Sequence, residues 1–592
     1  MMDPSPSGGW DSESTGRFAT SSQHLVLGQD DHTVTERPPT SSHSSSTTLP
    51  CPEDKDDEKK TTAVVGTAGE PEGWARGTGF WRCFVGICFP ILLSAFEGSV
   101  VSTALPTISR SLGLGPSSSW VATAFLLASI VFQPLFGQLA DIWGRRYLMM
   151  AAVAVFGAGS AIAAYAGSGA VLLCGRIVQG VGSGGIDLFA ELILCDIIPL
   201  KKRGHYVAIK AAVYALGTTV GPLLGGVFAQ TNWRWCFGVN IPVCALALVL
   251  MWFWLRLSSG TSWKGLSVLQ QIGQVDYLGI FLLTGSVVLI LCALSLAGAV
   301  YAWTDLTIVA SLAGGGGGIV LFVFWERSRL CAHPIMAPHV FSNRTTVAAM
   351  TVTAIHGFIT YGFQFYLPPF FQAVLGASPS RSGLLILPCS LTIVVLAAVG
   401  GPLLARFGKY RLMHLGGFAL MGAGLVPAIP LDESRSVVLW ISLSFLVGVG
   451  SGIIVSTTLP AVLVELTDKE NAAATGSWAF LRGLGSLLGV AVPNAIFNAR
   501  FSACLGSIDD AAARAELRDG QAYEHASASF IAGLDPLVRR QVLGAFTASF
   551  RFVWAIFLGF ALGGFVTALL ERQVRLRRDL DSDYGLEERV RK

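Results

Sequence analysis

The sequence predicts an all-α membrane protein whose chain crosses the bilayer fourteen times, and three observations predict this class. Residues 80–570 hold fourteen apolar stretches, each about as long as the roughly 20 residues that span a hydrocarbon core of about 30 Å. Hydrophobic residues make up 52% of the chain and charged residues only 13%. Three sequence patterns also recur in the same order in both halves, which predicts two six-helix repeats plus two inserted helices.

The apolar stretches define the expected helices. Inside lipid a spanning segment must satisfy its own backbone hydrogen bonds, and a run of this length does so as a helix. The stretches cover residues 80–104, 119–140, 147–167, 170–192, 206–229, 236–256, 276–298, 306–325, 345–366, 382–404, 411–430, 438–460, 473–496 and 549–570. They form an N-terminal six-helix bundle over 80–256, two inserted helices over 276–325 and a C-terminal six-helix bundle over 345–570.

Three polar segments flank or interrupt these bundles. Residues 1–75 are rich in Ser, Thr, Pro and charge, so we expect a disordered cytoplasmic tail there. Residues 571–592 are expected to form a second cytoplasmic tail. Residues 497–548 form a long polar loop, predicted to be external. It is either a small amphipathic cap, built on helix-forming stretches such as 509–518, or an unstructured insertion.

The distribution of Lys and Arg predicts the orientation, because cytoplasmic loops carry an excess of both. With the N-terminus inside, the cytoplasmic loops hold fourteen such residues: Arg145, Arg146, Lys201, Lys202, Arg203, Arg256, Lys264, Arg327, Arg329, Arg344, Arg406, Lys409, Arg411 and Lys469. The short external loops hold four: Arg110, Arg234, Arg381 and Arg435. Both termini are therefore expected in the cytoplasm, and a glycan on the sequon at Asn343 would contradict this.

The internal repeat is carried by three pairs of glycine-containing patterns. Gly137, Leu139, Gly144 and Arg145 match Gly401, Leu403, Gly408 and Lys409, 264 positions later. At the same separation, residues 221–225 (GPLLG) match residues 485–489 (GSLLG). Residues 180–184 and 448–452 share the pattern GVGSG. Two parallel halves that face a site near the membrane midplane are what alternating access requires.

Composition also excludes several classes of protein. A net charge of +3 spread over loops gives no footprint for nucleic acid. The chain contains no phosphate-binding G-x-x-x-x-G-K-[ST] motif and no nucleophile–base or metal constellation, so we expect neither an enzyme nor a cofactor. The expected partners are protons, a small-molecule substrate and membrane lipids, and we expect a monomer.

The loop after the second stretch carries a recognisable motif. Residues 137–146 read GQLADIWGRR, in which Gly144 permits a tight turn, Asp141 ends the helix and Arg145 and Arg146 anchor the cytoplasmic face. The motif resembles the signature of the major facilitator superfamily, and specifically its fourteen-span drug:proton antiporter branch of fungal toxin and multidrug exporters. The resemblance implies that Gly137, Asp141, Gly144, Arg145 and Arg146 latch the two halves. The alternative is a simple turn with an ion pair.

The fifth stretch favours export over uptake. Glycines at 217, 221 and 225 make a smooth helix face on which another helix can pack closely, and Pro222 kinks that helix. Gly217, Gly221, Pro222, Gly225 and Gly226 resemble the motif that marks exporters in the superfamily; the alternative is ordinary small-residue packing. The strings at 233–242 (WRWCFGVNIP) and 196–204 (DIIPLKKRG) also resemble this branch, although neither is obviously chemical.

Two intramembrane charges are the main candidates for the mechanism. Glu97 lies about 15 residues beyond Arg82, hence roughly 22 Å from the cytoplasmic edge, and Arg176 lies roughly 9 Å from the outer edge. Because these depths nearly coincide in a core about 30 Å thick, we expect the two side chains to meet. A central charge costs about 2.5–3.5 kcal/mol, so an unpaired one needs a role or a water-filled cavity.

Pairing with Arg176 favours the ionised form of the Glu97 carboxylate, whereas desolvation favours its protonated form. A site in which substrate entry shifts this balance can exchange substrate for a proton. The alternative is a permanent ion pair. Residues 97–106 (EGSVVSTALP) and 176–180 (RIVQG) resemble the first-span and fourth-span motifs of the branch, the latter implicated in proton coupling. The branch's first-span motif normally begins with Asp rather than Glu97.

Weaker candidates complete the expected site. Asp187 and Glu191 share a broad helix face with Arg176 and are either loop-facing acids or part of a proton path. Five further polar residues are candidates for a substrate cavity, with interhelical hydrogen bonding or packing as the alternative. They are Gln133, Gln179, His356, Gln364 and Arg482.

The expected function is a proton-coupled antiporter that exports small organic, amphipathic compounds such as a toxin, secondary metabolite or drug. We expect it in the plasma membrane, with a vacuolar or vesicle membrane as the alternative. The competing functions are an importer, such as a siderophore:proton symporter, and a non-transporting membrane sensor.

Overall fold

The computed structural model describes residues 78–574 except for 115–119, 199, 258–269, 271–272, 274, 299–300, 332, 430–436, 468–469, 519, 524 and 527. The tail expected over residues 1–75 and residues 575–592 of the second expected tail lie outside this part of the chain. The regular secondary structure of the described residues is helical, and an isolated bridge joins Ala297 to Tyr301. The predicted all-α fold is confirmed.

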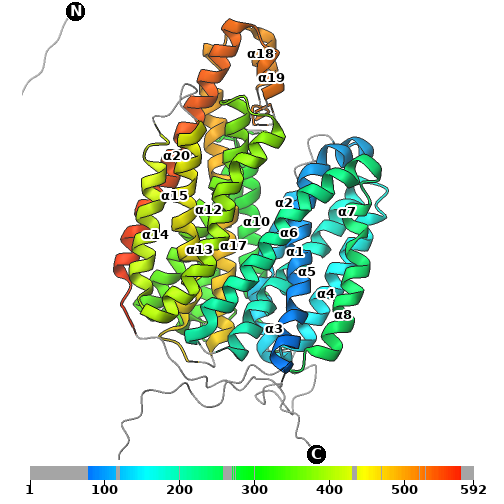
Figure 1. Ribbon diagram of the computed structural model, residues 1–592, viewed down its shortest axis with the longest axis vertical. Coiled ribbons are helices and arrows are strands. Elements are labelled where there is room, and N and C mark those ends of the chain that lie inside the picture. The colour runs from blue at the N-terminus through cyan, green and yellow to red at the C-terminus, as the bar shows by residue number, and fades with distance from the viewer. Residues whose placement is uncertain are drawn as a thin grey trace, which may run out of the picture. The chain divides into compact units, whose positions relative to one another are not determined.

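In its described residues, the N-terminal bundle contains eight helical segments, which form six longer units because two units are interrupted. They are α1 (Thr78–Leu112), α2 (Trp120–Val131), α3 (Gln133–Trp143), α4 (Arg145–Ala164), α5 (Gly169–Ile197), α6 (Leu200–Thr231), α7 (Trp235–Gly238) and α8 (Asn240–Trp254). Pro134 sits in the first turn of α3, where its missing N–H is tolerated, and the break at Phe132 separates α3 from α2. These helices are blue to green in Figure 1.

The inserted pair of helices and the C-terminal bundle follow along the chain. The inserted helices are α10 (Tyr277–Leu296) and α11 (Leu306–Arg327), followed by a short 3₁₀ turn, η2 (Pro338–Phe341). The C-terminal bundle comprises α12 (Arg344–Ala373), α13 (Pro379–Phe407), α14 (Tyr410–Leu425), α15 (Val437–Val455), α16 (Thr458–Leu463), α17 (Asn471–Cys504) and α20 (Pro536–Leu570).

Among the described residues, twelve helices are long and apolar enough to cross a membrane. The expected spans at 206–229 and 411–430 coincide with α6 and α14, which are not among the twelve. The described part of α14 has only 16 residues, fewer than a full crossing needs. A multi-pass membrane protein is thus confirmed, whereas the count of fourteen crossings stays a prediction.

The two bundles repeat one packing pattern, which is visible at their glycines. A Cβ on Gly180 or Gly184 of α5 would collide with the carbonyl oxygen of Phe125 or Ser129 on α2. In the second half, a Cβ on Gly448 or Gly452 of α15 would collide with the carbonyl oxygen of Cys389 or Ile393 on α13. Phe125 and Cys389 are 264 positions apart, and so are Ser129 and Ile393. Two of the three repeated sequence patterns have the same separation.

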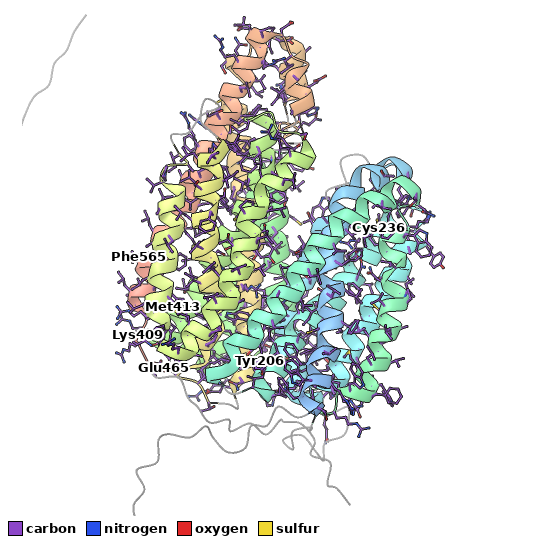
Figure 2. The ribbon with its side chains drawn as sticks, in the orientation of Figure 1. Tyr206, Cys236, Lys409, Met413, Glu465 and Phe565 are labelled. Carbon is purple, nitrogen blue, oxygen red and sulfur yellow. The ribbon has the colours of Figure 1, made fainter. Side chains whose placement is uncertain are left out.

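The bundles share an extended core at one end. That core joins Phe80, Tyr206 and Leu255 of the N-terminal bundle to Met350, Leu404 and Leu463 of the C-terminal bundle. At the other end the N-terminal bundle has a separate core, which includes Phe96 and Phe237. Figure 2 shows Tyr206, Lys409 and Glu465 at the shared end and Cys236 at the opposite end. The halves are therefore packed together at the end that carries the predicted cytoplasmic loops.

The long loop within the C-terminal bundle is shorter than its polar sequence suggests. α17 continues to Cys504 and α20 begins at Pro536; between them lie η4 (Leu505–Ser507), α18 (Ala511–Glu516) and α19 (Ala528–Ala532). Ile508 and Leu517 join the core of the C-terminal bundle. The Tyr523 ring stacks on Phe365 with centroids 5.7 Å apart, and burial raises the pKa of the Tyr523 hydroxyl above its ordinary value. In the described residues this segment forms a helical cap at one end of the bundle (Figure 1).

The end of α20 is fastened to the start of α14. His414 Nδ1 lies 2.9 Å from both carboxylate oxygens of Glu571, and neither side chain is exposed. The Tyr410 hydroxyl donates to the carbonyl of Arg572, and Gln573 Nε2 donates to the carbonyl of Gly408 at 2.6 Å. The four residues after α20 therefore belong to the folded bundle.

The inserted helices contact both halves. Val287 and Leu291 of α10 share a small core with Ile130 of α2 and Phe480 of α17. At one end of the pair, Asp276 Oδ1 accepts a hydrogen bond from Trp325 Nε1 at 2.8 Å. The pair thus lies against the seam between the two bundles.

Candidate functional site

Glu97 of α1 and Arg176 of α5 form a buried ion pair in the middle of the N-terminal bundle. Arg176 Nη1 donates to Glu97 Oε1, and the two side chains are 1% and 0% exposed. The structure therefore brings together Glu97 and Arg176, which the sequence predicted to lie at nearly the same depth in the membrane. Burial of both charges is costly, so the remaining polar atoms must also find partners.

Three more polar side chains complete this network. Asn240, the first residue of α8, donates from Nδ2 to Glu97 Oε2 at 2.5 Å. Arg176 Nη1 also reaches Gln179 Oε1 at 2.7 Å, and Gln179 Nε2 donates to Ser160 Oγ of α4 at 2.8 Å. Each Glu97 oxygen thus has a donor. Sequence reasoning missed Asn240 and Ser160; the available signal for Asn240 was a lone amide at the start of an apolar stretch.

The guanidinium of Arg176 is enclosed by aromatic rings and one carbonyl. Its carbon lies 4.3 Å from the centroid of Phe125 and 5.6 Å from that of Phe237. Arg176 Nε donates to the carbonyl of Val121 at 2.9 Å. These contacts favour a charged arginine inside a site with little access for water.

The glycines of α6 support the segment of α1 that carries Glu97. A Cβ on Gly217 would lie 2.7 Å from the Leu92 carbonyl oxygen, and a Cβ on Gly221 would strike Ser99 Oγ. Gly225 is buried. Pro222 and Gly226 belong to α6, but beyond their backbone they lie outside the described part of the structure. The close approach places α6 directly behind the turn of α1 that holds the carboxylate.

The expected latch residues make contacts mainly inside their own bundle. Gly144 has a φ of 81°, which a tight turn of this kind favours in glycine. Arg145 Nε lies 3.0 Å from Asp196 Oδ2, and Arg146 Nη2 donates to the carbonyl of Trp252 at 2.9 Å. The side chain of Asp141 lies outside the described residues. In the described contacts Gly137 approaches the other half, because a Cβ on Gly476 of α17 would lie 3.4 Å from its Cα.

The substrate-cavity candidates fall into two groups. Gln179 belongs to the Glu97 network. Four others lie on three helices: Gln133 on α3, His356 and Gln364 on α12, and Arg482 on α17. His356 Nε2 lies 2.9 Å from Ser451 Oγ, and Gln364 bonds to Thr360 and Ser390. Gln133 is buried, and its Oε1 accepts no hydrogen bond from the described residues.

A second set of charges, partly missed by sequence reasoning, lies where α1, α5, α6 and α17 meet. Lys210 of α6 pairs with Glu191 of α5 at 2.5 Å, and both are buried. Ser94 of α1 lies 2.7 Å from Ser183 and 3.5 Å from both carboxylate oxygens of Asp187. The signal for Lys210 was a lone amine within an apolar stretch.

Known proteins agree with this architecture. A sequence model described as the Major Facilitator Superfamily matches residues 87–490. The MFS-type transporter gkaD of Penicillium citrinum is 37% identical over 88% of this chain and 89% of its own. The efflux pump FUS6 of Gibberella fujikuroi is 37% identical over 88% and 94% of the two chains. The MFS-type efflux transporter ffsH of Aspergillus flavipes is 37% identical over 86% and 87%.

The solved structure of the human organic anion transporter MFSD10 (TETRAN) has the same fold. It matches with a TM-score of 0.54 and covers 83% of this chain and 100% of its own, at 14% sequence identity. That likeness concerns the fold alone.

Proposed function

This chain belongs to the major facilitator superfamily, and we propose that it is a proton-coupled antiporter that exports small organic, amphipathic compounds. We assign it to the fourteen-span drug:proton branch. The observation that carries the coupling mechanism is the buried Glu97–Arg176 pair. Several relatives that match over most of their length are named efflux transporters or efflux pumps, which supports outward transport.

The buried pair supports coupling because its charge state responds to small changes nearby. Ionised Glu97 is held by Arg176 and Asn240, whereas removal of either contact favours the protonated acid. Movement of α1 against α6 or α8 changes these contacts. A proton taken up from outside can then be released inward while substrate moves outward, which is antiport.

The energetics are sufficient for this exchange. One proton that moves inward across about 100 mV and about one pH unit releases roughly 3.7 kcal/mol. That energy sustains on the order of a 500-fold outward gradient of a neutral compound. The cycle requires no nucleotide, so the proton gradient is its energy source.

Location and orientation belong to the same proposal. The protein lies in the plasma membrane, with both termini in the cytoplasm and the cap of α18 and α19 outside. It acts as a monomer. In this orientation the end where the halves share a core faces the cytoplasm, so the structure corresponds to a state closed on the inside.

The test has two stages, because the substrate must first be found. Metabolites inside and outside cells are compared with and without the protein, and a compound that accumulates inside cells lacking it is the exported substrate. Failure to acquire a compound would instead favour import. If loss of residues 1–70 silences a cellular response but leaves flux unchanged, the sensor alternative gains support.

That compound is then loaded into vesicles containing purified protein, and a pH gradient is imposed. Glu97→Gln should retain the fold but lose gradient-driven flux, whereas Glu516→Gln, an exposed acid of the cap, should transport normally. Undiminished gradient-driven flux in Glu97→Gln refutes the proposed role.

A further inference from the structure

Asp187 lies on the same line of α5 as the Glu97 site, nearer the end where the halves meet. Arg176, Gln179, Ser183 and Asp187 are spaced by 3, 4 and 4 residues, so they follow one face of the helix. The Ser94 hydroxyl contacts both Ser183 and the Asp187 carboxylate. Ser94 itself precedes Glu97 by three residues on α1, close to one turn. Asp187 is thus the next acid along the α1–α5 seam.

The charges around Asp187 come from three helices. Glu191 follows it on α5, Lys210 and Tyr214 lie on α6, and Arg482 lies on α17; α6 and α17 both pack against α5. Lys210 is already paired with Glu191. Within the described residues Asp187 has no ion-pair partner within 4 Å, and Arg482 has none either; its guanidinium stacks on Trp478 at 5.4 Å. Asp187 is only partly buried, so water can reach it.

Arg482 belongs to the opposite half of the protein. Its helix, α17, packs against α5, which carries Asp187, and the shared core holds the two halves together at this end. A nearby cation stabilises the charged carboxylate, and its departure favours the protonated acid. Separation of the halves at this end would therefore change the proton affinity of Asp187.

We propose that Asp187 is a second proton-carrying carboxylate of the transport cycle, and that Arg482 controls its charge from the other half. This inference rests on the proposed proton-coupled function. When the cytoplasmic ends separate, Arg482 withdraws and a carboxylate oxygen of Asp187 forms an O–H bond with the proton that leaves Glu97. While the ends are apart, that O–H bond breaks and the proton passes to cytoplasmic water. When the ends close again, Arg482 returns and holds Asp187 ionised. Delivery of the proton is thereby confined to the state that is open to the cytoplasm.

Infrared difference spectroscopy of the full chain in lipid vesicles tests this without a known substrate, because the probe is the proton. Steps in pH should reveal carboxyl signals in the wild type that include one from Glu97 and one from Asp187. Asp187→Asn should remove one signal and Glu97→Gln the other, while Asp187→Glu should keep both. Arg482→Gln should raise the midpoint of the Asp187 signal by about one pH unit, since the carboxylate loses its cation. Arg500→Gln, on the same helix and stacked on Phe552, should cause no shift.

The outcomes separate this inference from the function on which it rests. Loss of a signal in Glu97→Gln with no change in Asp187→Asn overturns the role of Asp187 and leaves the proposed antiport intact. An unchanged midpoint in Arg482→Gln overturns the control by the opposite half. Proton-driven flux should be lost in Asp187→Asn and rescued in Asp187→Glu, which keeps the carboxyl group. Thermal unfolding should be similar in the two variants, so that this result supports proton carriage over a structural role.

Discussion

Glu97 and Arg176 are 79 positions apart in sequence, yet they form an ion pair with almost no exposure to solvent. A pair of this kind contributes little net stability, because desolvation of two charges offsets much of their attraction. Its loss on one side is costly, however. This asymmetry leads to the first prediction.

Arg176→Ala should impair transport and destabilise the protein by about 3–5 kcal/mol, because it leaves Glu97 buried without its cation. The double variant Glu97→Gln/Arg176→Met should recover most of that stability while transport stays absent. Thermal unfolding in detergent and flux in reconstituted vesicles measure the two effects. A double variant no more stable than Arg176→Ala would mean that the cost lies in packing rather than in the unpaired charge.

Gly221→Ala should reduce transport and destabilise the protein by about 1–3 kcal/mol, because the added methyl group strikes Ser99 and forces α6 away from α1. Gly86→Ala is a matched control on α1, since a Cβ there meets nothing within 4 Å. The measurements are thermal unfolding and initial flux. Equal behaviour of the two variants would show that the α1–α6 contact tolerates separation.

Truncation of the C-terminus should have a sharply defined limit. A chain that ends at residue 574 should unfold like the full chain, because its contacts with Tyr410 and His414 remain. A chain that ends at residue 570 loses them, at a cost of about 1–3 kcal/mol for each buried polar group left without a partner. Thermal unfolding of the two truncations measures the difference, and equal midpoints would show that residues 571–574 do not stabilise the bundle.

The fold and the central pair could be predicted because they depend on local signals. Apolar length identifies membrane helices, and counting residues from a membrane edge gives depth, which placed Glu97 beside Arg176. Helix ends were less accessible. α1 continues to Leu112 and α20 begins at Pro536, because helices extend beyond the lipid where hydropathy no longer marks them.

The partners of the site could not be predicted, because they are tertiary contacts. Asn240 reaches Glu97 across 143 positions, and no spacing rule links an amide at the start of α8 to an acid in α1. Resemblance to a family motif likewise did not reveal that Arg145 pairs with Asp196 of its own bundle. The latch between halves stays a prediction, although the described contacts bring Gly137 close to Gly476 of the opposite bundle.

The core that the two bundles share at the predicted cytoplasmic end has a thermal consequence. In the proposed cycle each turnover exposes to water the apolar surfaces that Tyr206 and Leu463 help to bury, and such exposure raises the heat capacity. The enthalpy of opening inward therefore rises with temperature. The free energy of opening inward should therefore depend on temperature along a curve rather than a straight line.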